Sequence, residues 1–239
     1  EIYIEKVLEN KKFQIRSFKK LTNHLYVKKV TTTIELKSSA EEHFSEIKSN
    51  FRRKIRKAEK LNLKSVCGGV ELLDDFYRVF AINMRDLGTP VYAKQFFKTV
   101  LDTASADTKI VVLKNTQGLP VSASFLLGYK QRLEVPWAST LRKYNYTNAN
   151  MQLYWQMLKY ACDTGYQTFD FGRSSVDAST YKFKKQWGAQ PQLLHWHKFD
   201  QHGALIKEQL AATSPGKLRP IAENMWKKLP LTITVADGS

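Results

Sequence analysis

The sequence predicts an α+β fold in which helices pack on both faces of a mixed sheet. Between residues 37 and 103, apolar residues recur at spacings of three and four, the period of amphipathic helices. After residue 108 the pattern changes to short runs of apolar and β-branched residues, three in succession, followed by helix, strand, helix and strand. This order of elements is typical of one sheet covered by helices.

The first 36 residues are rich in β-branched and aromatic residues and predict four short strands, at 1–5, 12–18, 25–30 and 31–36. They resemble the end of a sheet that lacks its beginning. Because the chain starts at Glu1 instead of methionine, we expect it to be a fragment, a processed form or a trimmed chain.

Three helices are predicted next. Ser38 and Ser39 each precede a glutamate by three residues, a capping-box pattern, and begin one long helix that reaches Leu61. One face of this helix is apolar and the other is basic. A second helix over 72–87 ends near Gly88, and a third covers 93–103.

The strands at 109–113, 121–129 and 133–140 predict a meander, with a turn at 115–118. Pro136 predicts a bulge or an edge, since proline cannot donate a hydrogen bond to a neighbouring strand. A helix over 151–162, a strand at 167–171, a helix over 180–187 and a strand at 193–199 follow. Residues 203–229 predict two peripheral helices, divided at Pro215.

Composition limits the class of protein. With 43% hydrophobic and 12% aromatic residues among 239, the chain can bury a core and is not a disordered protein. The 38 Lys+Arg against 22 Asp+Glu give a net charge of +16, which attracts nucleic acid, nucleotide-linked substrates or an anionic membrane face. Two cysteines and no long apolar run predict a reduced cytoplasmic protein, with the inner membrane face as a surface it can touch.

Several motifs occur together: NMRDLGTPV at 83–91, VPWAS at 135–139, and FDFGRS at 169–174 running into YKFKKQWG at 181–188. The basic helix FRRKIRKA at 51–58 and WKKLP at 226–230 accompany them. In combination they resemble the FemAB family, most closely its exosortase (PEP-CTERM)-associated branch, in the GNAT-type acyltransferase superfamily. FemAB-like proteins resemble two GNAT domains in tandem. The resemblance therefore implies remnant strands of a first GNAT-like domain at 1–36, a second acyltransferase domain at 37–200 and a helical extension at 201–239.

The resemblance also implies site residues. Lys184, in the Phe183–Lys184 pair, corresponds to a lysine in the transfer cleft of FemAB-like enzymes, where a cation stabilises the oxyanion of an attacked carbonyl. A solvated helix face shared with Lys182 and Lys185 is the alternative. Asp170 joins Lys184 and Phe183 as a catalytic candidate.

Other residues are candidates for substrate binding. Arg173 follows Gly172 at a strand–helix junction and could hold a phosphate or carboxylate, or instead pair with Asp170. Arg85 is a candidate anion ligand or a helix C-terminal cation. The aromatic candidates are Tyr92, Trp137 and Tyr181, with core packing as the alternative for Trp137.

The basic helix provides candidate ligands for tRNA or another polyanion, namely Arg52, Arg53, Arg56 and Lys57. No metal is expected, because His195 and His197 alternate on one strand without a third ligand at a suitable spacing. The cysteines lack a neighbouring histidine, so direct attack by the acceptor is the simpler scheme.

The sequence leaves three functions open. The first is transfer of an acyl or aminoacyl group to an amine or hydroxyl in cell-envelope or exopolysaccharide synthesis, from aminoacyl-tRNA to a nucleotide- or lipid-linked saccharide or peptide. The second is a coenzyme A-dependent N-acyltransferase, which the absence of glycine from residues 141–151 disfavours. The third is a non-enzymatic nucleic-acid-binding protein. The donor, aminoacyl-tRNA or acyl-CoA, is expected to be a substrate, with no tightly bound cofactor.

Overall fold

The computed structural model describes residues 2–7, 12–17, 30–103, 107–176, 178–199 and 219–231. The described strands form two sheets, one with the order β4-β5-β6-β7-β8-β3-β9 and a smaller one with the order β1-β2-β10. In the larger sheet β4 to β7 pair antiparallel, whereas β7 and β8 pair parallel, so the sheet is mixed. The predicted α+β class is therefore confirmed.

The elements follow the predicted order along the chain. The strands are β1 (Ile2–Val7), β2 (Lys12–Ser17), β3 (Val30–Glu35), β4 (Lys64–Gly68), β5 (Asp107–Lys114), β6 (Pro120–Tyr129), β7 (Arg132–Thr140), β8 (Thr168–Ser174), β9 (Gln190–Leu193) and β10 (His195–Phe199). The helices are α1 (Ala40–Glu46), α2 (Ser49–Glu59), α3 (Leu73–Leu87), α4 (Lys94–Thr103), α5 (Ala149–Asp163), α6 (Ser179–Gln186) and α7 (Arg219–Trp226), with 3₁₀ turns η2 (Val70–Leu72) and η3 (Arg142–Thr147). Most of the segment predicted as two peripheral helices lies outside the described residues.

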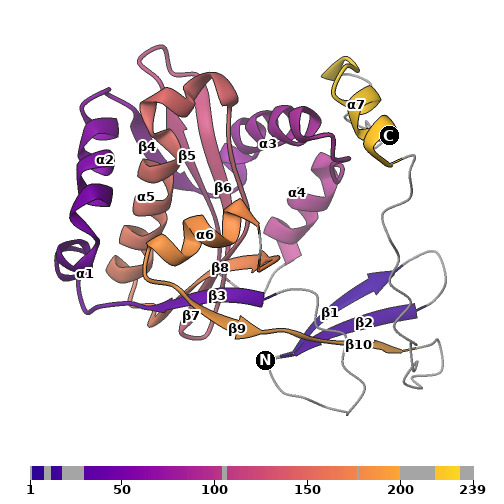
Figure 1. Ribbon diagram of the computed structural model, residues 1–239, viewed down its shortest axis with the longest axis horizontal. Helices are drawn as coiled ribbons and strands as arrows, with labels where there is room; N and C mark the ends of the chain where they lie inside the picture. Colours follow the sequence, from indigo (N-terminus) through magenta and orange to yellow (C-terminus); the bar gives the residue numbers. More distant parts are fainter. Residues whose placement is uncertain are drawn as a thin grey trace. The chain divides into compact units, whose positions relative to one another are not determined.

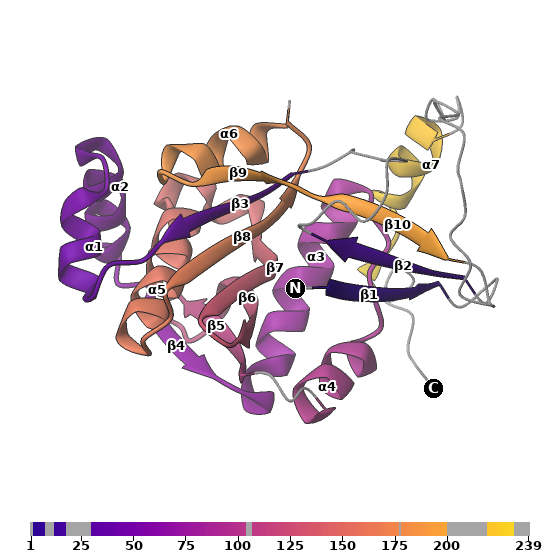
Figure 2. The ribbon, with the colours of Figure 1, turned by 90° about the horizontal axis from the view of Figure 1, so that it is seen from below.

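The chain divides into two compact units, and each is described by itself. One comprises residues 34–170 with 217–239, and the other residues 1–33 with 171–216. In the first unit α3 and α4 lie on one face of the strands β5 and β6, while α5, with α1 and α2 beside it, covers the other face (Figures 1 and 2). The second unit contains α6, the pairing of β3 with β9, and the small sheet.

An aromatic core joins α3, α4 and the sheet. Phe76, Phe97 and Phe125 are fully buried, and their ring centroids lie 5.1 to 5.6 Å apart. Each such side chain removes a large apolar area from water, which is the main favourable term in folding. The buried face of α3 is therefore held against this core. This contact fixes the rotation of the helix about its axis, and so the directions in which its remaining side chains point.

Local signals in the sequence are confirmed at three points. Ser39 caps α1 by accepting the Glu42 N–H at 3.1 Å, and Gly88 ends α3 with φ of 78°, a conformation that favours glycine. In the pairing of β6 with β7, two residues of β7, Val135 and Pro136, lie opposite the single Leu126. The bulge predicted from Pro136 is therefore present.

Three local details differ from the prediction. The single helix expected from Ser38 to Leu61 is two helices, because the backbone leaves the helical conformation at Ile47 and Lys48, with ψ of 136° and 137°. Ile47 is buried there, so the apolar stripe continues through the break and the period alone does not reveal it. Strand β4 was not predicted, because it lies at the sheet edge with mostly exposed side chains and lacks an alternating pattern. The predicted strand 193–199 is divided between β9 and β10.

Candidate functional site

Lys184 is buried on α6, with 6% of its surface exposed. Its ammonium donates to the carbonyl oxygens of Gly172 at 2.9 Å and Arg173 at 3.2 Å, where β8 ends. Gly172 has φ of 74°, which a residue with a side chain adopts at a cost. Lys182 and Lys185 are exposed. Lys184 is thus not part of a solvated helix face, and the junction holds a cation at a defined position.

Two aromatic side chains accompany Lys184 on the same helix. Phe183 is half-buried and meets the buried Trp187 edge-on, with 6.2 Å between ring centroids. Tyr181 is half-buried, and the ammonium of Lys185 lies 5.8 Å from its ring centroid. The helix therefore presents the predicted residues Tyr181, Phe183 and Lys184 together.

Asp170 is almost fully buried and forms an ion pair of 2.6 Å with Arg132. The two residues belong to neighbouring strands, since Glu134 of β7 lies in register with Asp170 of β8. A buried charge needs such a partner, because removing it from water is costly. Asp170 therefore pairs with Arg132 of the neighbouring strand, a partner that the sequence did not suggest, and Arg173 is exposed.

Tyr92 and Trp137 line a common pocket of about 510 Å³ beside the β7 bulge. Their ring centroids are 6.3 Å apart, and Tyr92 also stacks on Phe96 at 4.8 Å. Trp137 is half-buried against the core, so it both packs and lines the pocket. All lining residues are uncharged: Phe80, Met84, Thr89, Pro90, Val91, Tyr92, Pro136, Trp137 and Ala138. Such a wall suits an apolar, aromatic or sugar group.

Arg85 lies in the last turn of α3 and forms an ion pair with the adjacent Asp86 at 2.9 Å. Both groups are half-buried. The position matches the expected helix C-terminal cation, although Arg85 is not among the residues lining the Tyr92 pocket.

The basic helix α2 turns most of its cations to solvent. Phe51, Ile55 and Ala58 are buried, whereas the predicted polyanion ligands Arg53, Arg56 and Lys57 are exposed. Arg52 is half-buried and donates to the carbonyl of Ser45, at the end of α1. The helix therefore presents a row of solvated positive charges.

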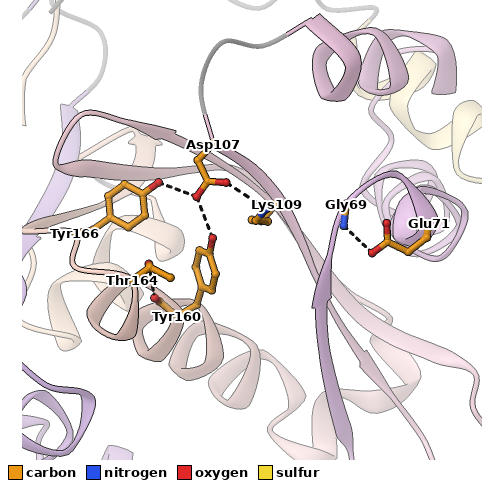
Figure 3. Close-up of polar contacts among 7 residues, drawn as sticks. All are labelled: Gly69, Glu71, Asp107, Lys109, Tyr160, Thr164 and Tyr166. Atoms are coloured by element: carbon orange, nitrogen blue, oxygen red, sulfur yellow. Dashed lines mark hydrogen bonds and ion pairs between the residues drawn. The ribbon is translucent and has the colours of Figure 1, made fainter.

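A cluster around Asp107 was not found from the sequence (Figure 3). Tyr160 and Tyr166 each donate a hydroxyl hydrogen bond of 3.0 Å to this carboxylate, and Lys109 lies 3.3 Å from it. Burial acts to raise the pKa of Asp107, but these three donors outweigh it and the pKa is lowered. Burial, followed by the Asp107 contact, raises the pKa of Tyr166 to about 12. The cluster joins residues more than 50 positions apart and stabilises the fold.

The start of α5 lacks the glycine-rich loop that cradles pyrophosphate in many coenzyme A enzymes. Asn148 adopts the left-handed conformation with φ of 58°, and the Ala149 N–H donates to the hydroxyl of Thr147 at 3.2 Å. That hydroxyl in turn donates to the carbonyl of Tyr144. The N–H of the first residue of α5 is therefore engaged within the chain.

The described part of the chain contains both cysteines, Cys67 and Cys162. Within it, no three His, Cys, Asp or Glu side chains are grouped so that they could hold a metal ion. Cys162 is buried, and this burial raises the pKa of its thiol and makes it a weak nucleophile. None of the described helices is long and apolar enough to cross a bilayer.

Known proteins resemble this chain in fold. FemX, a FemAB-family protein, has 15% sequence identity and a TM-score of 0.62, with 75% of this chain and 64% of FemX covered. L-PGS from Bacillus licheniformis has 10% identity and a TM-score of 0.52, with 85% and 66% covered. The C-terminal domain of a protein assigned as lysylphosphatidylglycerol synthetase, from Agrobacterium fabrum, has 9% identity and a TM-score of 0.54, with 72% and 60% covered. The chain thus spans less than two thirds of each of these structures.

A search of curated proteins finds none that matches. A family model does match: the acetyltransferase (GNAT) domain aligns with residues 45–185, which begin in α1 and end in α6. The match covers more than half of the chain and agrees with the mixed sheet and its flanking helices. The protein therefore belongs to the GNAT family of acyltransferases.

Proposed function

We propose that the protein transfers an aminoacyl or acyl group to an amine or hydroxyl of a cell-envelope or exopolysaccharide precursor. The GNAT domain supports acyl transfer, and the FemX and lysylphosphatidylglycerol synthetase neighbours, although they show likeness of fold alone, favour an aminoacyl group. The observation that carries the proposal is the buried ammonium of Lys184.

The reaction needs a stabilised oxyanion. The acceptor nitrogen or oxygen forms a bond to the carbonyl carbon of the donor and loses a proton, and the carbonyl oxygen becomes negative. When the tetrahedral intermediate collapses, the bond to the carrier's oxygen or sulfur breaks and the carrier leaves with a proton. A cation already held by two carbonyl dipoles needs little reorganisation to stabilise this oxyanion. We assign that role to Lys184, with Phe183 packing beside it.

Other residues have supporting roles in the proposal. The Asp170–Arg132 pair holds β8 against β7, and Asp170 thereby positions the strand that ends at the Lys184 carbonyls. Tyr92 and Trp137 provide an uncharged wall for a saccharide or peptide group of the acceptor. Arg85, Arg173 and Tyr181 are also proposed to be substrate-binding residues.

The donor is proposed to be aminoacyl-tRNA. The α5 N-terminus uses the Ala149 N–H internally, which disfavours a coenzyme A pyrophosphate there. The exposed cations Arg53, Arg56 and Lys57 on α2, with Arg52 beside them, suit an RNA backbone. The same cations would suit an anionic membrane face, and we propose that the protein acts in the cytoplasm near that face, as a member of the exosortase-associated branch.

The domain assignment is part of the proposal. We propose that residues 37–200 form the transfer domain and residues 1–36 the last strands of a first GNAT-like domain, with residues 201–239 as an extension.

A donor-exchange assay tests the proposed function. The chain is incubated with tRNA charged with radiolabelled amino acids, or with radiolabelled acetyl-CoA, and with nucleotide-linked or lipid-linked precursors as acceptors. We expect label to move from the tRNA only, and to be lost when the tRNA is digested beforehand.

The same assay decides between the alternatives. Transfer from acetyl-CoA alone would favour the second candidate, a coenzyme A-dependent N-acyltransferase, which the acetyltransferase-domain match supports. Salt-sensitive RNA retention without transfer from either donor would favour a nucleic-acid-binding protein and contradict the proposal.

A further inference from the structure

The C-terminal helix α7 packs against the end of α3. Both helices belong to the same compact unit, and α7 lies beside the last turn of α3 (Figure 1). A Cβ atom added at Gly88 would lie 2.9 Å from the carbonyl oxygen of Glu223 and 3.1 Å from Cε of Lys227. The approach to a backbone oxygen is too close for a side chain, so Gly88 is required by this contact as well as by its φ of 78°.

The helix has one half-buried side and one exposed side. Glu223, Trp226 and Leu229, spaced by three residues, are half-buried, whereas Met225 is 66% exposed. Because Glu223 contacts the end of α3, the half-buried side faces that helix. Leu231, which follows α7, packs against the aromatic core between α3, α4 and the sheet. The C-terminal segment is therefore attached at two points, the end of α3 and the core.

The residues that follow Gly88 form one wall of the Tyr92 pocket. Residues 89–92 all line this pocket. At the far end of the wall, the hydroxyl of Tyr77 on α3 donates a 3.1 Å hydrogen bond to the carbonyl of Tyr92. At the near end, Gly88 is in contact with α7. No described residue of α7 is among those that line the pocket, so α7 can act on it through this wall.

Two motifs that are distant in the sequence thus meet: the turn at Gly88 belongs to the motif at 83–91, and α7 leads into the motif at 226–230. We propose that α7 is a positioning element for substrate binding, which fixes the turn at Gly88 and thereby the pocket wall at 89–92. The inference rests on the proposed function, in which this pocket receives the acceptor. A wall that is ordered beforehand loses less entropy when the acceptor binds.

Two variants loosen α7 at different points. Gly88→Ala introduces a side chain that conflicts with the Glu223 carbonyl, and Leu231→Ala removes packing against the core without touching the turn or the pocket lining. Both should raise the KM for the acceptor by about tenfold. Neither alters the junction that holds Lys184, so kcat and the KM for the donor should stay within about threefold. A fall in kcat with an unchanged acceptor KM would contradict a role in binding.

Each variant has a matched control. Gly165→Ala, just after α5, places a side chain at φ of 80°, and nothing lies within 4 Å of the added Cβ atom. It introduces similar backbone strain at a helix end without a conflict with α7. Met225→Ala shortens a side chain on the exposed side of α7. Both controls should leave the acceptor KM within about twofold of the unmodified chain. Equal acceptor KM values in Leu231→Ala and Met225→Ala would overturn the inference.

Hydrogen exchange measures the positioning without the reaction. The amide of Thr89 donates to the Met84 carbonyl at 2.9 Å, and its exchange should become about tenfold faster in Gly88→Ala and Leu231→Ala but not in the controls. Unchanged exchange in both variants would overturn the inference, whether or not the chain catalyses transfer. Faster exchange with an unchanged acceptor KM would also overturn it, because the wall would then not contribute to binding.

The two measurements separate the inference from the proposed function. If the unmodified chain transfers no group from either donor, the proposed function fails. Faster exchange of the Thr89 amide in Gly88→Ala and Leu231→Ala would then still support the positioning of the pocket wall by α7, and unchanged exchange would still overturn it.

Discussion

Two short basic helices of this protein, α2 and α6, use their cations in opposite ways. In α2 the apolar side chains Phe51, Ile55 and Ala58 are buried, and the cations Arg53, Arg56 and Lys57 face solvent. In α6 the buried member is itself a cation, Lys184, while its neighbours Lys182 and Lys185 are exposed. Similar runs of lysine and arginine can therefore form a solvated surface or a site with one desolvated charge.

The energetic consequences differ accordingly. An exposed lysine keeps its hydration shell, and its removal usually changes the free energy of unfolding by less than about 0.5 kcal/mol. A buried ammonium has lost that shell and depends on the dipoles around it, in Lys184 the carbonyls of Gly172 and Arg173. The buried ammonium, unlike an exposed one, is held at one position. Because little water surrounds it, its interaction with a charge that develops in a reaction is weakly screened and therefore stronger.

The largest expected effect is on catalysis. Lys184→Ala should lower kcat by roughly 100-fold, because it removes the charge that stabilises the oxyanion, with little change in KM. Lys185→Ala, one residue along the same helix, should change kcat by less than about threefold. Steady-state rates in the transfer assay measure both. A Lys184→Ala enzyme as fast as the Lys185→Ala enzyme would contradict the catalytic role.

The next effect is on stability. Lys184→Met keeps most of the side-chain volume but leaves the Gly172 and Arg173 carbonyls without this donor, and should lower the free energy of unfolding by about 1–3 kcal/mol. Lys57→Met on α2 should change it by less than about 0.5 kcal/mol. Urea denaturation measures the difference. If Lys184→Met is as stable as the unmodified chain, the free energy gained from the Lys184 hydrogen bonds is offset by the cost of removing its charge from water.

A change at Gly172 tests the position of the charge. Gly172→Ala places a side chain at φ of 74°, which should cost about 1–2 kcal/mol and displace one carbonyl that holds Lys184. Gly118→Ala is the control. Gly118 has φ of 76° and open space around it, so the change introduces similar backbone strain at a position distant in sequence from Gly172. If both variants lose similar stability but only Gly172→Ala also loses activity, the carbonyl position matters for transfer.

On α2 the expected effect is smaller and depends on salt. Arg53→Gln and Lys57→Gln each remove an exposed cation, so the slope of log affinity for tRNA against log salt should become shallower by roughly 1 per variant. Filter binding from low to physiological salt measures the slopes. Lys98→Gln on α4, whose ammonium pairs with Asp102 at 2.7 Å, serves as the control. An unchanged slope in the α2 variants would exclude this helix from the RNA-binding surface.

The smallest expected effect concerns a charge held by hydrogen bonds at the surface. The pKa of Asp107 is lowered in the folded chain, so its contribution to stability is present above the pKa of an unfolded aspartate, roughly 3.9, and is lost as pH falls through the folded value. Tyr166→Phe removes one hydrogen-bond donor to the Asp107 carboxylate. The variant should therefore lose less stability on acidification than the unmodified chain. Urea midpoints between neutral pH and about pH 3 measure it. A steeper acid loss in Tyr166→Phe would contradict the assignment.

Local patterns in the sequence were sufficient for most of the fold. The apolar period of α3, its end at Gly88 and the bulge at Pro136 follow from backbone chemistry within a few residues, and all three are confirmed. The break between α1 and α2 was missed because a buried Ile47 keeps the apolar stripe continuous. The edge strand β4 was missed because an exposed strand needs no alternation.

The candidate site was predictable in part. Motifs indicated Lys184, Tyr92 and Trp137, and the structure places the last two in one pocket. The Asp107 cluster and the contact of Gly88 with α7 carry no local signal, since their members come from separate strands, helices and turns.

By itself, the sequence determined the order and type of most secondary structure elements, the excess of positive charge and the residue types available for acyl transfer. Only the tertiary structure decided which cation is buried, and that Asp170 pairs with Arg132. The physical reason is that helix and strand formation depends on neighbours a few residues apart. The desolvation of a charge depends instead on carbonyls and side chains that folding brings from elsewhere in the chain.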